Sequence, residues 1–322
     1  MKNYLCISVL ISAIIFSCIN SALIKEGCTD GIYLWYNSII PILLPFMMLT
    51  GIIINIIRSM HISKYLAFAI SLTIGLLCGF PTGTMIITFF FENNTLSRRD
   101  AQLLLPLCNN ASPMFIIGYV HAMFIAETFP IHILIALIYL PQIACTAILF
   151  YTSYIHQNYN SHIQAETITH SMQIHGVNEK HKLCSQNEAA VTISKNATTS
   201  KQTDDQSMMI RCITNITVIG IYISIFSIIS ATICRYIPGI TAHIVTSFLE
   251  ISNGIQEISA LNMPANIKTA LTISLTSFGG LSAIFQSHDM IKSSGLSFIK
   301  YILCKSVFGI ICYITSYAYM TI

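Results

Sequence analysis

Two interruptions inside apolar stretches carry residue types that could bind a small molecule. Residues 79–84 (GFPTGT) break the apolar run that begins at Lys64, and residues 108–113 (CNNASP) break the next run. A helix broken at membrane depth is tolerated only where protein or a water-filled cavity surrounds it, because backbone in lipid must satisfy its own hydrogen bonds. In secondary transporters such breaks form the substrate and ion sites. The two interruptions therefore favour a carrier.

The first interruption predicts a hairpin tip. Pro81 removes a backbone donor and disfavours helix at the preceding residue. Gly79 and Gly83 permit unusual dihedrals and close backbone approach. We expect free amide groups and the Thr82 hydroxyl at this tip. The alternative is a kink in one long helix.

The second interruption predicts a half-helix that points at a ligand. Asn109 and Asn110 are costly in an apolar span unless they are paired or hydrated. Pro113 suits the start of a new helix, and Ser112 or Asn110 could cap it. The N-terminus of that half-helix would offer N–H groups to an anion or polar ligand, and the Asn oxygens could hold Na⁺. The alternative is hydrogen bonding between helices through the two Asn side chains.

A third group of polar residues lies near position 250. His243, Thr246, Glu250, Asn253 and Glu257 follow one another at spacings of three or four, which predicts one helical face. A carboxylate in a membrane helix marks a functional site by default, so Glu250 is the candidate for binding a cation or carrying a proton. The alternative is an amphipathic helix at the outer surface.

A fourth segment, 277–282 (SFGGLS), occupies in the second half of the chain the place of CNNASP in the first. Gly279 and Gly280 are expected to break the span, and Ser282 to cap the half-helix that follows. Gln286 comes one turn later, on a similar face.

Composition sets the class of protein. Of the 322 residues, 54% are hydrophobic and only 9% are charged, whereas a soluble chain carries about 25% charged residues. The sequence therefore predicts an all-α polytopic protein in the lipid bilayer of the cell membrane. The net charge of +3 is dispersed, so we expect no nucleic acid partner.

Several other functions find no support in the sequence. It has no HExxH, GxSxG, GxGD or phosphate-loop motif, so no enzyme and no catalytic residue is predicted. The eleven cysteines include no CxxC pair, which argues against zinc sites and disulfides. The His-rich segment after Tyr154 matches no metal motif. We expect no cofactor and no metal beyond a coupling ion, Na⁺ or H⁺.

The apolar runs divide the chain into four parts. Residues 1–36 are expected to form an N-terminal span and an outer loop, 37–153 a first transmembrane repeat, 154–208 a flexible polar cytoplasmic linker, and 209–322 a second repeat. The predicted spans are 4–24, 37–57, 64–92 (broken), 100–127 (broken), 131–153, 209–234, 238–261, 265–291 (broken) and 296–319.

The basic residues indicate how these spans are oriented. Arg58, Lys64, Arg98 and Arg99 all lie on the cytoplasmic side if 64–92 turns back as a re-entrant hairpin. With 238–261 read as an outer hairpin, each half becomes span, hairpin, broken span, span, in opposite orientations. The predicted fold is thus two inverted repeats with re-entrant hairpins and broken helices. The alternative is a simple bundle with irregular loops.

The ordered motifs resemble those of YlbJ-type sporulation integral membrane proteins, within the wider nucleoside-recognition Gate domain group. The resemblance rests on the following segments: GFPTG at 79–83, Leu96-Ser97, CNNASP at 108–113, LEISNG at 249–254 and SFGGLS at 277–282.

This resemblance implies transport of dipicolinic acid across the outer forespore membrane, out of the mother cell, during endospore formation. Two alternatives stay open: a nucleoside permease, and a non-transporting membrane organiser needed for assembly of the spore envelope and cortex. A homo-oligomer or a sporulation membrane partner is compatible with either. Half-helix N-termini at Ser112 and Ser282 are expected to supply neutral donors for carboxylates.

Overall fold

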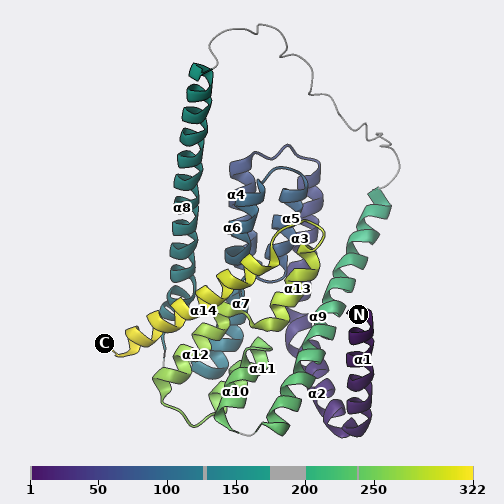
Figure 1. The fold of residues 1–322 in the computed structure, drawn as a ribbon. Coiled ribbons are helices and arrows are strands. Elements are labelled where there is room, and N and C mark those ends of the chain that lie inside the picture. Colours follow the sequence, from purple (N-terminus) through teal and green to yellow (C-terminus); the bar gives the residue numbers. More distant parts are fainter. Residues whose placement is uncertain (1, 126–128, 175–200, 238, 322) are drawn as a thin grey trace.

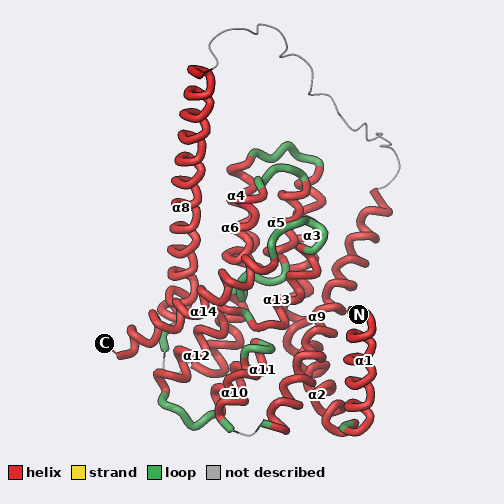
Figure 2. The backbone as a smooth tube through the Cα atoms, viewed as in Figure 1, coloured by secondary structure: helices red, strands yellow, loops and turns green. Residues whose placement is uncertain are grey.

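The computed structural model describes residues 2–125, 129–174, 201–237 and 239–321, and in this part of the chain all regular structure is helical (Figures 1 and 2). The predicted all-α class is confirmed for these residues. In chain order the helices are α1 (Lys2–Ile19), α2 (Ser21–Leu34), the π-helix η1 (Trp35–Ile39), α3 (Ile40–Arg58), α4 (Lys64–Cys78), α5 (Thr82–Glu92), α6 (Arg98–Cys108), α7 (Pro113–Phe115), the π-helix η2 (Ile116–Ile125), α8 (Ile131–Ile174), α9 (Lys201–Tyr236), α10 (Ile240–Ser247), α11 (Ile251–Ala260), α12 (Ala265–Phe278), α13 (Gly280–Ile291) and α14 (Phe298–Thr321).

The helices are those of a multi-pass membrane protein. Within the described ranges, five are long and apolar enough to cross a membrane, and a pair bent by 96° near the N-terminus could supply a sixth. Large apolar side chains such as Leu140, Ile213 and Leu303 are exposed, whereas Asn109 and Gln142 are fully buried. Lipid tolerates exposed apolar groups and excludes unpaired polar ones, which explains this distribution. The five spans are Arg98–Ala122, Ile131–Ile155, Cys212–Tyr236, Ala265–Ile291 and Phe298–Thr321.

In the first half of the chain, a hairpin is followed by a broken span. Helices α4 and α5 turn back on each other at residues 79–81, and α6 is separated from α7 by residues 109–112. The Lys64 Nζ lies 2.6 Å from the Asp100 Oδ2, so the start of α4 and the start of α6 meet at one end of the molecule. The start of the first hairpin and the segment that follows it therefore lie at the same end of the molecule.

The second half repeats the order of hairpin and broken span. Helices α10 and α11 form a short hairpin, and α12 is separated from α13 at Gly279, whose φ is 93°. Figure 1 shows α4 and α5 in the upper part of the molecule and α10 and α11 in the lower part. The two hairpins thus approach the middle of the molecule from opposite ends.

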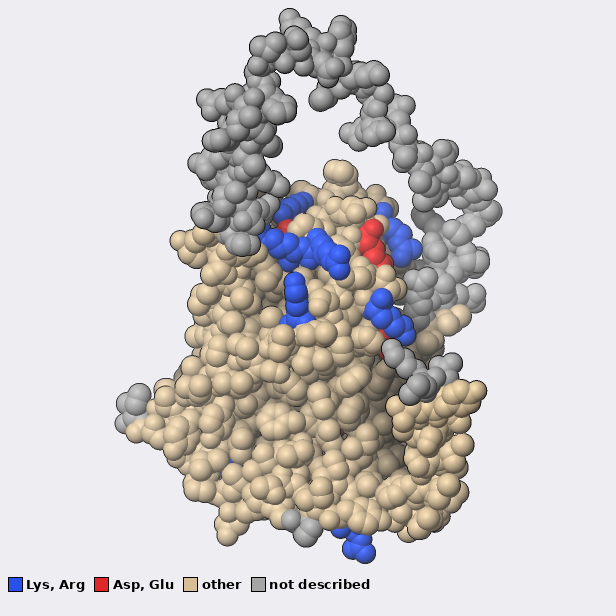
Figure 3. Space-filling model, viewed as in Figure 1, with Lys and Arg blue, Asp and Glu red and all other residues tan. Residues whose placement is uncertain are grey.

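Positive charge gathers toward the end that carries the base of the first hairpin. In Figure 3 most of the Lys and Arg side chains in view lie in the upper half, and the lower half is almost entirely uncharged. Arg58, Lys64 and residues Asn93–Thr95 line one hollow at this end. The Arg99 Nη2 donates to the Phe150 carbonyl of α8 at 3.3 Å.

The N-terminal region differs from the prediction. Residues 25–36, expected as an outer loop, are helical in α2 and η1, and α2 leaves α1 at a sharp bend. Gly27 and Gly31 let α2 pack closely on α9, because a Cβ on either would come within 2.9 Å of the α9 backbone. Small residues that let helices approach closely are typical of membrane interfaces. The Trp35 Nε1 also donates to the Ile216 carbonyl at 2.9 Å.

The predicted flexible linker, 154–208, is also wrong at both ends. Helix α8 continues to Ile174, and α9 begins at Lys201. Residues 175–200 lie outside the described part of the chain. Polar composition argued against an independent fold, but a helix needs no core when it extends a span that is already formed, because elongation costs less than nucleation.

Candidate functional site

A pocket lies where the hairpin tips and the broken spans meet. The cavity is narrow: about 50 Å³ is open to the centre of a water-sized sphere, which is room for a few water molecules, so the walls must move apart to admit a larger ligand. Most of its wall is apolar, and the polar groups are few. The lining residues are Ile39, Leu43, Phe80, Ala111, Ser112, Phe115, Ile219, Ile223, Glu250, Ile251, Ser282, Ala283 and Gln286.

Glycine brings the first hairpin tip against the first break. The Phe80 backbone N–H donates to the Asn110 carbonyl at 2.8 Å. A Cβ on Gly79 would lie 2.6 Å from that same carbonyl oxygen, and one on Gly83 would lie 1.9 Å from the Cys108 carbonyl oxygen. Real Cβ atoms do not approach so closely, so both positions require glycine. These two residues position the wall of the pocket without lining it.

The Thr82 hydroxyl is not free, contrary to the prediction. It is buried and donates to the Gly79 carbonyl at 2.6 Å, which closes the turn of the hairpin. Pro81, the residue before α5, is buried as well. The tip therefore presents the Phe80 ring to the pocket.

The two asparagines of the second interruption bind other helices. The Asn109 Nδ2 lies 2.6 Å from both the Ser287 Oγ and the Tyr301 hydroxyl oxygen. The Asn110 Nδ2 donates to the Leu107 carbonyl at 3.0 Å and also to the Gln142 Oε1. Both side chains therefore fit the alternative of hydrogen bonding between helices.

Ser112 and Pro113 behave as the sequence predicts. Pro113 opens α7, and the Ser112 Oγ accepts a hydrogen bond from the Phe115 backbone N–H at 3.2 Å. Ser112 also lines the pocket. Such a cap can be predicted from the sequence, because the Ser hydroxyl accepts a hydrogen bond from a backbone N–H only three residues further along the chain.

Lys305, in the middle of α14, was missed by the sequence analysis. It is fully buried, and its Nζ donates to the Asn110 Oδ1 at 2.5 Å. The Nζ also lies 5.8 Å from the centre of the Phe80 ring and 5.9 Å from that of Phe308. The Lys305 amino group thus lies directly behind the Phe80 wall of the pocket. The signal available in the sequence was a lysine inside an apolar span, beyond Lys300 near the start of the same helix, and an ionisable residue within a span is a mark of function.

Glu250 lies at the tip of the second hairpin. It precedes α11, and its Oε2 accepts a hydrogen bond from the Asn253 backbone N–H at 2.8 Å. Only 3% of the residue is exposed, and it lines the pocket. The predicted single helical face from His243 to Glu257 is wrong, because the chain turns at 248–250 between α10 and α11.

Asn253 does not line the pocket. Its Nδ2 donates to the Ser227 Oγ on α9 at 3.0 Å. The following residue, Gly254, packs on α10, where a Cβ would lie 2.1 Å from the Ser247 carbonyl oxygen. The 3–4 spacing that suggested one helix therefore reflects two short helices packed against each other.

The second break docks onto the second hairpin through its backbone. The Leu281 N–H donates to the Phe248 carbonyl at 2.9 Å, and the Ser282 N–H donates to the Leu249 carbonyl at 2.8 Å. These amides are the ones expected to receive a carboxylate at Ser282, so that prediction is wrong for the backbone. Gly279 and Gly280 have positive φ values of 93° and 75°, which form the break.

Ser282 and Gln286 still contribute side chains to the pocket wall. The Gln286 Nε2 donates to the Ser282 Oγ at 3.1 Å. Gly279, in the second half of the chain, packs directly against Phe80 in the first half. A Cβ at Gly279 would lie 2.9 Å from the Phe80 ring, so a side chain there would separate the two. Of the predicted site residues, the structure brings four together in the pocket wall: Ser112, Glu250, Ser282 and Gln286.

The comparisons with known proteins add no further constraint. No family model, no curated protein and no solved structure matches this chain.

Proposed function

We propose that this chain is a membrane carrier for a small, planar, anionic metabolite. The observation that carries the proposal is the position of the pocket. Residues of both hairpin tips and of both broken spans line it together. Interrupted helices that meet around a cavity near the middle of the molecule are the usual construction of a transporter site.

The proposed architecture is a pair of inverted repeats with re-entrant hairpins. In each half, the hairpin tip forms backbone hydrogen bonds with the following broken span: Phe80 with Asn110, and Phe248 and Leu249 with 281–282. The hairpins come from opposite ends of the molecule (Figure 1). Rocking of one repeat against the other would expose the pocket alternately to the two sides of the membrane.

The chemistry of the pocket supports an aromatic anion as the substrate. The Phe80 and Phe115 rings and several aliphatic side chains suit a flat, largely apolar ring. Lys305 lies behind Phe80, and in its protonated form its attraction for an anion would be strengthened by the low polarity around it. Dipicolinic acid, a planar pyridine with two carboxylates, fits this description and is the substrate that the resemblance to YlbJ-type proteins implies.

We propose H⁺ as the coupling ion. A Glu250 carboxylate in the wall would repel a dianion, so taking up a proton together with the substrate would remove that repulsion. Na⁺ coupling was suggested by the Asn side chains, but the Asn110 Oδ1 already accepts a hydrogen bond from Lys305. Binding of Na⁺ would require several oxygen ligands, whereas binding of H⁺ requires only the Glu250 carboxylate.

Uptake into proteoliposomes tests the proposal. Purified protein should take up radiolabelled dipicolinate saturably, and unlabelled dipicolinate should compete while uridine should not. Saturable uridine uptake, with no effect of dipicolinate, would instead identify a nucleoside permease. If folded protein transports neither compound, the carrier proposal is contradicted and a non-transporting organiser of the spore envelope is favoured.

A further inference from the structure

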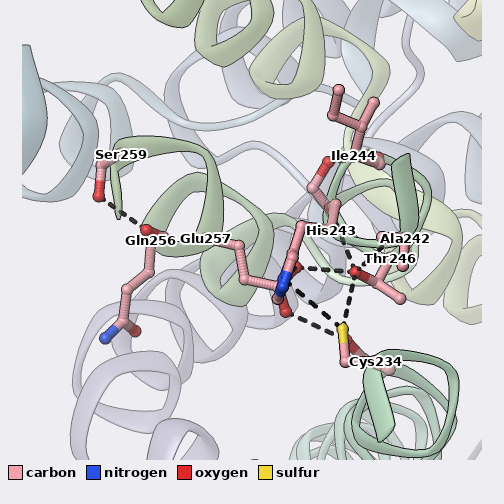
Figure 4. A network of polar contacts seen from close by, with 10 residues as sticks. Cys234, Ala242, His243, Ile244, Thr246, Gln256, Glu257 and Ser259 are labelled. Carbon is pink, nitrogen blue, oxygen red and sulfur yellow. Dashed lines mark hydrogen bonds and ion pairs between the residues drawn. The ribbon is translucent and has the colours of Figure 1, made fainter. Parts of the chain in front are cut away.

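Three side chains of types that can bind a metal converge at the base of the second hairpin (Figure 4). Cys234 belongs to the last turns of α9, His243 to α10 and Glu257 to α11. Their thiol, imidazole and carboxylate donor atoms all lie within 4.8 Å of one another. The Cys234 Sγ is 3.6 Å from the His243 Nδ1, which is 3.7 Å from the Glu257 Oε2.

These separations suit a metal bound between the three groups. With bonds of about 2.3 Å to sulfur and about 2.0–2.1 Å to nitrogen, a tetrahedral Zn²⁺ site separates those two donors by about 3.6 Å. The corresponding separation of nitrogen and carboxylate oxygen is about 3.4 Å. Small side-chain rotations would therefore bring all three groups into coordination.

Neighbouring hydroxyl groups orient the carboxylate. The Thr246 hydroxyl lies 2.8 Å from the Glu257 Oε2, and the Ser230 hydroxyl donates to the Glu257 Oε1 at 3.2 Å. Hydrogen bonds from an outer shell that hold a ligand in place are typical of metal sites. The His243 side chain is 41% exposed and that of Glu257 is 24% exposed, so an ion and a water ligand can enter from the surface.

We propose that Cys234, His243 and Glu257 bind one divalent transition-metal ion, with Zn²⁺ the best fit to this donor set. Thiolate and imidazole ligands select Zn²⁺ and its neighbours over Mg²⁺ and Ca²⁺, which require oxygen ligands. The ion joins both helices of the second hairpin to α9 and so holds in place the hairpin whose tip carries Glu250. The proposed metal site is independent of the proposed carrier function, because the experiment that tests it measures metal binding and not transport.

Cobalt spectroscopy of the full-length protein in detergent tests this site. The starting variant should carry Cys184→Ser and Gln in place of the linker histidines His156, His162, His170, His175 and His181, since these could bind metal independently. After chelator treatment, Co²⁺ should bind at one equivalent and give a thiolate-to-cobalt charge-transfer band. Zn²⁺ should then displace it.

Single substitutions assign the ligands. Cys234→Ser should abolish the charge-transfer band, whereas Cys28→Ser, at a half-buried cysteine of α2, should retain it. Glu257→Gln and Thr246→Val should keep the band with weaker binding, by about 10–100-fold for Thr246→Val. These two variants test the site even if Cys234→Ser does not fold. The proposal is overturned if the starting variant gives no thiolate band, or if the band is the same in Cys234→Ser.

Discussion

The ammonium group of Lys305 donates a hydrogen bond to the side-chain oxygen of Asn110 at 2.5 Å, although the two residues are 195 positions apart in the chain. The bond joins the last helix to the break between α6 and α7. It holds the Lys305 amino group directly behind the Phe80 wall of the pocket. A buried lysine is costly in a membrane span and marks a candidate functional site, which supports a role for Lys305 in the proposed transport.

Replacing Lys305 with Met should reduce dipicolinate uptake without preventing folding, because the apolar chain fills the same space and removes the charge. We expect a loss of about tenfold or more, which corresponds to about 1.4 kcal/mol of attraction for the anion. Lys300→Met, at an exposed lysine of the same helix, is the matched control. Equal initial rates for Lys305→Met and the parent protein would show that the Lys305 charge does not attract the substrate.

Asn110→Ala should destabilise the protein through Lys305. The substitution leaves the buried Lys305 Nζ without this hydrogen-bond partner, and a hydrogen bond to a charged group contributes about 1.5–3 kcal/mol. Thermal unfolding in detergent measures the effect. The double variant Asn110→Ala/Lys305→Met should be more stable than Asn110→Ala alone, because the unpaired charge is gone. Additive losses in the double variant would contradict a direct interaction.

Gly83→Ala should prevent the first hairpin from docking on the first break. The new Cβ would lie 1.9 Å from the Cys108 carbonyl oxygen, which belongs to backbone and cannot move aside as a side chain can. Overpacking of this kind costs about 1–3 kcal/mol or more. Gly118→Ala is the control, since a Cβ there has no neighbour within 4 Å. A melting temperature unchanged in Gly83→Ala would argue against this packing.

Glu250→Gln should separate binding from proton coupling. The amide oxygen can still accept the hydrogen bond from the Asn253 N–H, so the hairpin tip should keep its shape. The side chain can no longer exchange a proton, so an imposed pH gradient should stop driving accumulation of dipicolinate while exchange of internal and external substrate continues. Glu92→Gln, at an exposed position at the end of α5, should respond to the gradient as the parent does. Gradient-driven accumulation by Glu250→Gln would exclude Glu250 as the coupling group.

Local signals predicted the interrupted helices well. Pro113 with Ser112, and Gly79 and Gly83 in the first hairpin, act on backbone within a few residues of themselves. The structure has these breaks where the sequence places them. Glu250 lines the pocket, but the single helix predicted around it is wrong, because a spacing of three or four does not distinguish one helix from two short helices packed face to face.

The sequence by itself determined the class of protein, the positions of its breaks and the polar residues around them. Hydrophobicity, proline, glycine and capping act over short distances and can be read along the chain. Only the tertiary structure decided which polar groups face the pocket and which are paired inside the protein. One partner of Asn110 is on α14, and the side chains of Cys234, His243 and Glu257 come from three helices, so neither arrangement leaves a pattern at any fixed spacing.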